Sequence, residues 1–178
     1  NPSQFFLDER PMGLAGTVVV AALEGTRPIM IELQALVSPT NLITPRRMAT
    51  GLDSNRVSLL IAVLEKRIGL HLQGEDIFVN EAGGLRLDEP ALDLGIAAVI
   101  TSSYREKAID PDTVIIGEVG LVGEVRAVPQ IEKRLKEAQK LGFKKCLAPR
   151  NNLKGKDLGL DLEILEVHSV AQALEMLF

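Results

Sequence analysis

The sequence has one cysteine, no tryptophan and few other aromatic residues, namely five phenylalanines and one tyrosine. The single cysteine, Cys146, cannot form an internal disulfide, and without a Cys-x-x-Cys pair there is no zinc knuckle. This cysteine usage is typical of a reducing compartment, so we expect a cytoplasmic protein. No apolar run approaches the roughly 20 residues that a membrane-spanning helix needs, and the N-terminus lacks the layout of a signal peptide. We therefore expect no membrane partner.

Residues that hold metals or nucleotides are equally scarce. His71 and His168 have no cysteine or acidic partner at ligand spacing, which predicts no metal site. Gly83 and Gly84 lack the Gly-x-x-x-x-Gly-Lys-Ser/Thr layout that cradles nucleotide phosphates, and no other segment supplies it. We expect that this chain holds no cofactor and does not hydrolyse ATP by itself.

A formal net charge of −4 and a pI near 5.3 mean that the surface as a whole repels nucleic acid. Contact with DNA therefore requires a local basic patch. The candidates lie in one loop and the helix that follows it: Arg46, Arg47, Arg56, Lys66 and Arg67. A guanidinium suits phosphate because it donates two parallel hydrogen bonds. The alternative is a solvated polar edge, which is common for scattered basic residues on a mildly acidic domain.

A hydrophobic content of 46% in 178 residues is enough for one core, so we expect one domain over residues 1–178. Residues 17–23 and 29–37 are rich in Val, Ile and Leu and flank a turn, which predicts a β-hairpin. Asp53 or Ser54 is expected to cap a helix whose apolar residues follow at helical spacing. Residues 77–79 and 85–87 flank a Gly-rich turn and predict a second hairpin.

The second half of the chain alternates helices and strands. A buried helix is expected from Pro90, a residue favoured in a first turn because its missing amide proton is not needed there. Then follow a strand from Val114, a Gly-rich hairpin, a helix over 131–141, strands over 146–148 and 162–165, and a last helix from Ser169. Residues 149–159 are linker-like but too short to divide the domain. The sum predicts a mixed fold, α/β or α+β in class.

Five long segments cover most of the chain: NPSQFFLDER, EGTRPIMIELQALVSPT, TPRRMATGLDSNRVSLLIAVLEKR, LDEPALDLGIAAVI and IGEVGLVGEVRAVPQIEKRLKEAQKLGFKK. Together they resemble the Lon-protease-like C-terminal domain of the RadA (Sms) family of bacterial recombination and repair proteins. The resemblance implies the fold of the Lon proteolytic domain, which is like domain 2 of ribosomal protein S5. It also implies that the parent carries a zinc finger and a RecA-like ATPase ahead of Asn1, where Zn, Mg and ATP would bind. Residues 1–15 would then be an arm or linker from that ATPase.

The same resemblance implies a function that depends on assembly and on DNA. The expected role is non-catalytic: a ring-forming, homohexameric, DNA-contacting domain of an ATPase that promotes branch migration in homologous recombination and DNA repair. In a symmetric ring, two arginines on each subunit would form a belt of positive charge. DNA, further copies of the chain, and recombinase or helicase proteins are the expected partners.

Proteolytic members of the Lon family carry a Lys-Asp-Gly-Pro-Ser-Ala-Gly loop and, farther along, a lysine that takes the proton of the serine. Aligning the shared Asp and Pro with Asp88 and Pro90 puts Ala91 at the serine. Counting onward without gaps puts Glu132 at the lysine, with Lys133 beside it. A methyl group cannot attack a carbonyl, so the resemblance implies that this chain is not an enzyme.

Two other functions stay open on the residues alone. A peptidase with a different nucleophile would use Ser102 or Ser103 together with Lys107. A peptide-binding module would keep the groove of the protease family without cleaving. Glu89 and Asp93, four residues apart, would share a helix face and suit acid–base chemistry or a hard cation. The stronger interpretation of these two carboxylates is that a first helical turn stabilises negative charge.

Overall fold

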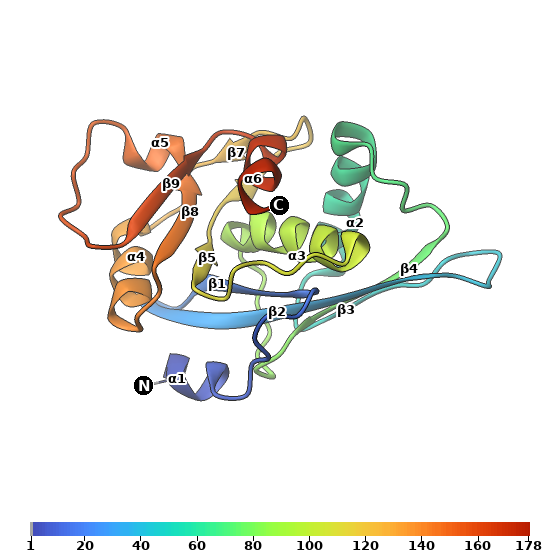
Figure 1. Ribbon diagram of the computed structural model, residues 1–178, viewed down its shortest axis with the longest axis horizontal. Helices are drawn as coiled ribbons and strands as arrows, with labels where there is room; N and C mark the ends of the chain where they lie inside the picture. Colours follow the sequence, from blue (N-terminus) through green and yellow to red (C-terminus); the bar gives the residue numbers. More distant parts are fainter. Residues whose placement is uncertain (1) are drawn as a thin grey trace.

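The first part of the chain forms the antiparallel hairpin that its sequence predicts. The computed structural model describes residues 2–178, in which β1 (Thr17–Glu24) pairs with β2 (Arg27–Pro39). Gly25 lies in the tight turn between them with a φ of 63°, a left-handed conformation that glycine adopts without steric penalty. The hairpin lies at the centre of the sheet (Figure 1).

The sheet has seven strands in the order β3-β4-β2-β1-β5-β8-β9. The strands outside the hairpin are β3 (Arg47–Thr50), β4 (Glu75–Glu81), β5 (Thr113–Ile115), β8 (Lys145–Pro149) and β9 (Glu163–Val167). The pairs β1–β2 and β2–β4 are antiparallel, and the other neighbouring pairs are parallel. The predicted mixed α/β fold is confirmed. The predicted Gly-rich hairpin is also present, as the separate pair β6 (Glu118–Val119) and β7 (Val125–Arg126).

The helices begin largely where the sequence places them. They are α1 (Pro2–Leu7), α2 (Ser54–Val63) with its π-helical continuation η1 (Leu64–Ile68), the 3-10 turn η2 (Pro90–Leu92), α3 (Asp93–Arg105), α4 (Ile131–Lys140), α5 (Arg150–Leu153) and α6 (Val170–Leu177). Asp53 caps α2 by accepting a hydrogen bond from the N–H of Asn55, and Ser169 caps α6 through the N–H of Gln172. Both predicted helix starts are confirmed.

The helix α3 is the buried helix expected after Pro90. Its residues from Asp93 to Ser102 are all buried, and it crosses one face of the sheet (Figure 1). A methyl group on Gly95 would collide with Cγ1 of Val20 on β1. Glycine at this position therefore lets the helix approach the strand closely.

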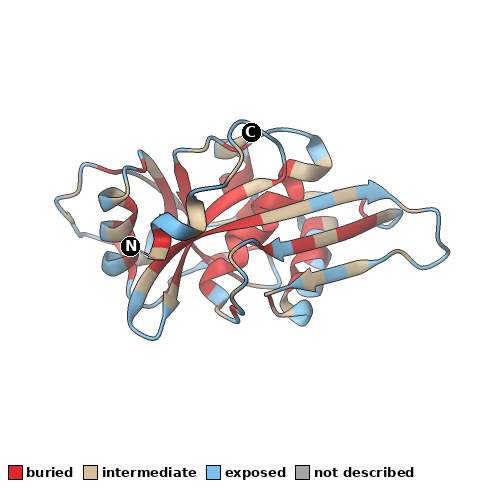
Figure 2. Cartoon of the chain, turned by 90° about the horizontal axis from the view of Figure 1, so that it is seen from below, coloured by how far each residue is buried: buried red, intermediate tan, exposed pale blue. Residues whose placement is uncertain are grey.

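Apolar residues fill both faces of the central strands. Val18 and Val20 of β1 belong to the core under α2, α3 and α6, whereas Val19 and Ala21 belong to the core under α4 and α5. This alternation follows the two-residue period of a strand. The second face is covered only in part, because exposed and intermediate residues run along the outer lengths of β2, β3 and β4 (Figure 2).

The hairpin predicted around Gly83 is wrong. Residues 85–87 do not return along β4, and Leu87 instead forms a parallel bridge with Leu52. The carboxylate of Glu81 accepts hydrogen bonds from the N–H groups of Gly83 and Leu85, which turns the chain away from the strand. The short elements α1, β3 and α5 are not predicted from the sequence, and β3 begins inside the segment that we expected to be a loop.

Candidate functional site

Position 91 lies in the turn that leads into α3. Ala91 is 2% exposed and belongs to the apolar cluster that includes Val128 and Ile131. Its carbonyl accepts a hydrogen bond of 3.0 Å from the N–H of Gly117, whose own carbonyl accepts one of 3.0 Å from the N–H of Leu94. Through these two hydrogen bonds, Gly117, in the segment that follows β5, holds the turn at η2 and at the start of α3.

Glu132, the position aligned with the catalytic lysine, lies on the outer surface of α4, and Lys133 is exposed beside it. Both line a groove of about 460 Å³ together with Lys136 and Asn152, and Ala91 is not part of that lining. Ala91, which is aligned with the serine of Lon-type proteases, thus lies in an apolar core, and Glu132, which is aligned with their lysine, is exposed to solvent.

A buried ion pair that the sequence did not predict lies close to position 91 in the chain. Arg134 of α4 is 0% exposed and pairs with the carboxylate of Glu89. Its other nitrogens donate to the carbonyls of Ala21 (2.8 Å) and Pro129 (2.9 Å). Glu89 also accepts a hydrogen bond of 2.9 Å from the N–H of Leu23. The pair therefore joins α4, β1 and the turn before α3.

A buried carboxylate, that of Asp93, begins α3. It is 1% exposed and pairs with Arg56, one of the predicted DNA-contacting residues. It also accepts a hydrogen bond of 3.0 Å from the N–H of Val119, whose carbonyl accepts one of 3.2 Å from Arg56. Burial raises the pKa of the Asp93 carboxyl, while the hydrogen bonds from Arg56 and Val119 oppose that rise. Asp93 thus pairs with Arg56, and Glu89 pairs with Arg134.

The serines at the end of α3 bond to the backbone. The hydroxyl of Ser102 accepts a hydrogen bond of 2.9 Å from the N–H of Gly16 and donates one of 2.5 Å to the carbonyl of Lys107. The hydroxyl of Ser103 accepts one of 3.0 Å from the N–H of Val37. The side chain of Lys107 lines a separate groove. Over the described residues, neither hydroxyl has the amine of this lysine as a hydrogen-bond partner.

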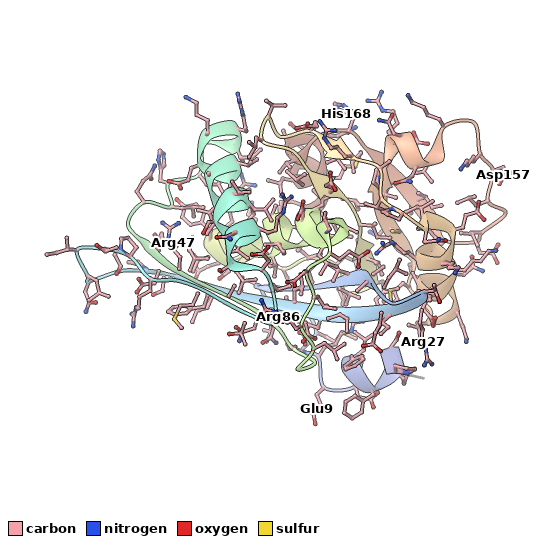
Figure 3. All side chains as sticks on the ribbon, turned by 180° about the vertical axis from the view of Figure 1, so that it is seen from behind. Glu9, Arg27, Arg47, Arg86, Asp157 and His168 are labelled. Atoms are coloured by element: carbon pink, nitrogen blue, oxygen red, sulfur yellow. The ribbon has the colours of Figure 1, made fainter. Side chains whose placement is uncertain are left out.

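The predicted arginine pair lies where β3 begins. Arg46 donates to Asp76 through Nε (3.2 Å) and Nη2 (2.7 Å), and this contact lowers the pKa of Asp76 to about 2. The side chain of Arg46 is still 54% exposed. Arg47 donates a hydrogen bond of 2.7 Å to the carbonyl of Leu72. Arg47 lies toward the end of the molecule that carries α2, opposite the end that carries Asp157 (Figure 3).

Lys66 and Arg67 lie in the last turn of η1 and are exposed. Neither forms an ion pair within residues 2–178. The five predicted contacts therefore differ in availability. Arg56, whose side chain is 32% exposed, pairs with the buried Asp93. Arg46 and Arg47 have protein partners, and the two η1 cations are free of ion pairs within residues 2–178.

Few other side chains are placed for ligand chemistry. Among the described residues, no group of three or more His, Cys, Asp or Glu side chains could hold a metal ion. Cys146 is buried in β8, and burial raises the pKa of its thiol. No helix in residues 2–178 is long and apolar enough to cross a bilayer.

Comparison with known families gives the class of protein. Residues 32–152 match the family model described as "Subunit ChlI of Mg-chelatase". Because the match covers more than half of the chain, the chain belongs to this family.

The chain is also similar over nearly its whole length to proteins named "DNA repair protein RadA". It is 56% identical to the one from Halalkalibacterium halodurans over 176 residues, 99% of this chain and 38% of that protein. The protein of the same name from Bacillus subtilis is 56% identical over 174 residues, 98% of this chain and 38% of its own length. The one from Listeria monocytogenes is 50% identical over 175 residues, with coverages of 98% and 38%. The chain thus spans well under half the length of these relatives.

Proposed function

We propose that this chain is the Lon-protease-like domain of a RadA-type protein. In this role it is a non-catalytic, ring-forming and DNA-contacting domain of a RecA-like ATPase that promotes branch migration in homologous recombination and DNA repair. The observation that carries the proposal is an identity of 50–56% over 98% or more of the chain to proteins named DNA repair protein RadA. In such a cytoplasmic parent, ATP, Mg and Zn bind outside this chain, and recombinase or helicase proteins are further partners.

Absence of catalysis is supported by the two aligned positions. Ala91 has no group that can be deprotonated, and it is buried among apolar residues. Glu132 is an exposed carboxylate on α4. The purified chain should therefore neither form an acyl adduct with a serine-directed acylating probe nor digest an unfolded protein. Either activity would contradict this part of the proposal and favour a Lon-type Ser/Lys peptidase.

Assembly is supported by the uncovered face of the sheet. The strand register places Leu36 of β2, Phe78 of β4 and Met48 of β3 side by side. Leu36 is 60% exposed and Met48 is 54% exposed, and with Leu14, at 59%, they line a groove of about 490 Å³. A contiguous exposed apolar surface of this kind typically marks a protein contact. We assign it to contacts between subunits of a homohexamer.

DNA contact is assigned first to Arg46 and Arg47, and then to Lys66 and Arg67. Arg46 is about half exposed although it pairs with Asp76, and a guanidinium has further N–H groups that can bond phosphate. Arg56 comes last because Asp93 holds it. These residues neutralise phosphate charge and position the duplex, and they do not read bases.

The test of assembly is the native mass of the chain, measured with and without duplex DNA. We expect a mass of several subunits that shifts when DNA is added. The double substitution Leu36→Asp and Met48→Asp should reduce the assembly to monomers. Leu121→Asp with Val122→Asp, which changes two exposed side chains in the β6–β7 turn, is the matched control. A wild-type monomer that ignores DNA would overturn the proposal, and equal disruption by both variants would overturn only the assigned surface.

The test of DNA contact is the salt dependence of binding. Arg46→Ala with Arg47→Ala should weaken binding and reduce the slope of log affinity against log salt by ~0.9 for each phosphate that is no longer neutralised. Lys133→Ala with Lys140→Ala removes the same charge from the exposed side of α4 and should leave the slope near that of the wild type. Circular dichroism checks that each variant folds, since Arg46 also holds Asp76. An unchanged slope in the arginine variant would contradict the assignment.

A further inference from the structure

Three basic side chains from two distant parts of the sequence line one groove. Arg67 comes from the end of η1, Arg105 from the last residue of α3, and Lys107 from the loop that follows. With residues of α6 they surround a groove of about 510 Å³. The helix α6 lies over the region of α3 in Figure 1, which brings these elements together. All three basic side chains are exposed.

The positive charge of this groove is only partly offset. None of the three cations forms an ion pair within residues 2–178. Glu175 of α6 is the one acidic residue in the lining. The C-terminal ends of η1, α3 and α6 carry partial negative charge, which helps to explain why cations are stable there. The three cations outnumber the one acidic side chain, so the side chains of the groove carry a net positive charge on a chain whose formal net charge is −4.

The remaining lining of the groove is apolar and consists of Ile68, Ala171, Leu174 and Phe178. The guanidinium of Arg105 lies 6.0 Å from the centroid of the Phe178 ring. Phe178 is the one aromatic residue in the lining, so the groove lacks the series of rings on which successive bases of a single strand stack. Aliphatic surface beside cations suits instead a peptide that carries both carboxylates and an apolar side chain.

We propose that this groove binds a short acidic peptide segment of a partner protein. Carboxylates of the peptide contact Arg67, Arg105 and Lys107, and one aliphatic or aromatic side chain packs against Ile68 and Ala171. The groove is separate from Ala91 and from the arginines at the start of β3, none of which line it. Peptide binding here therefore does not use Arg46 or Arg47. It does use Arg67, which the function proposed above also assigns to DNA, so peptide and DNA would compete for that one residue.

The test is fluorescence anisotropy with the full chain and a labelled synthetic peptide of four aspartates followed by leucine and phenylalanine. The triple substitution Arg67→Gln, Arg105→Gln and Lys107→Gln should weaken binding at least about tenfold, because it removes three charge-assisted hydrogen-bond donors. The control triple Lys133→Gln, Lys140→Gln and Lys154→Gln removes the same charge from other exposed positions and should change affinity less than about twofold. Equal weakening by both triples would mean non-specific attraction and would overturn the proposal.

Two single substitutions test the lining itself. Glu175→Gln removes the one acidic side chain and should tighten binding of the same peptide. Ala171→Trp places a large ring on an exposed lining position and should block the peptide, whereas Ala62→Trp on the exposed side of α2 should not. A peptide of four aspartates followed by two glycines should bind more weakly than the parent peptide. Equal affinity of the two peptides, or displacement of the parent peptide by a single-stranded oligonucleotide at similar concentration, would overturn the assignment to an acidic peptide.

Discussion

Replacing Arg134 with methionine should destabilise the domain by about 4 kcal/mol. Methionine keeps an unbranched chain in the core but removes a guanidinium that is 0% exposed. The change breaks the pair with Glu89 and leaves the carbonyls of Ala21 and Pro129 without their donor. Breaking a buried pair costs about 3–5 kcal/mol, and Glu89 keeps the N–H of Leu23 and 20% exposure, which favours the lower part of that range. The carbonyl of Ala21, a fully buried residue, adds about 1 kcal/mol, whereas Pro129 is an exposed residue whose carbonyl can bond to water.

The assay is thermal and urea unfolding of the purified chain. For a domain of this size, about 4 kcal/mol corresponds to a fall in Tm of roughly 8–16 °C. Lys133→Met, an exposed change on the same helix, should stay within about 0.5 kcal/mol of the wild type. Glu89→Gln combined with Arg134→Met should cost less than the sum of the single changes, because both remove one shared interaction. A destabilisation below about 1 kcal/mol for Arg134→Met would refute the reasoning.

Two more predictions concern stability. Arg46 lowers the pKa of Asp76 to about 2, below the value of about 3.9 in the unfolded chain. This ion pair therefore stabilises the fold above about pH 4, and the stabilisation is lost as the pH falls toward 2. Asp76→Asn should therefore lower the free energy of unfolding at pH 6 and lower it less near pH 2. Urea titrations that give the same difference between variant and wild type at both pH values would contradict this prediction. Gly95→Ala should lower the free energy of unfolding by about 1–3 kcal/mol because its methyl group meets Val20. Gly74→Ala, with open space around it, should lower it by less than about 1 kcal/mol. Similar destabilisation of both variants would show that α3 does not need its close approach to β1.

The elements that the sequence predicts well are those whose pattern is local. Residues 17–23 and 29–37 consist largely of strand-forming side chains around a turn, and they pair as expected. The helix after Pro90 is apolar around most of its circumference, and it lies buried against the sheet. Asp53 and Ser169 form caps within their own turns, so their roles follow from their immediate neighbours.

The features that the sequence does not predict depend on contacts between distant residues. Residues 85–87 have a strand-like composition, but Leu87 pairs with Leu52 because the side chain of Glu81 redirects the backbone. The partners Arg134 and Glu89 are separated by 45 positions, and no local rule connects them. The sequence does contain one indication that Arg134 is buried. Arg134 follows Ile131 by three residues and so lies on the apolar face of its own helix.

The hydrogen bonds between Ala91, Gly117 and Leu94 limit what a nucleophile introduced at position 91 could do. A serine introduced at position 91 would bring a hydroxyl into a site that is 2% exposed and surrounded by hydrocarbon. A substrate could reach that hydroxyl only if the turn held by Gly117 opened. A proton acceptor would also have to be introduced on α4. Because several coordinated changes would be needed at once, the single substitution Ala91→Ser would not create a hydrolytic site here.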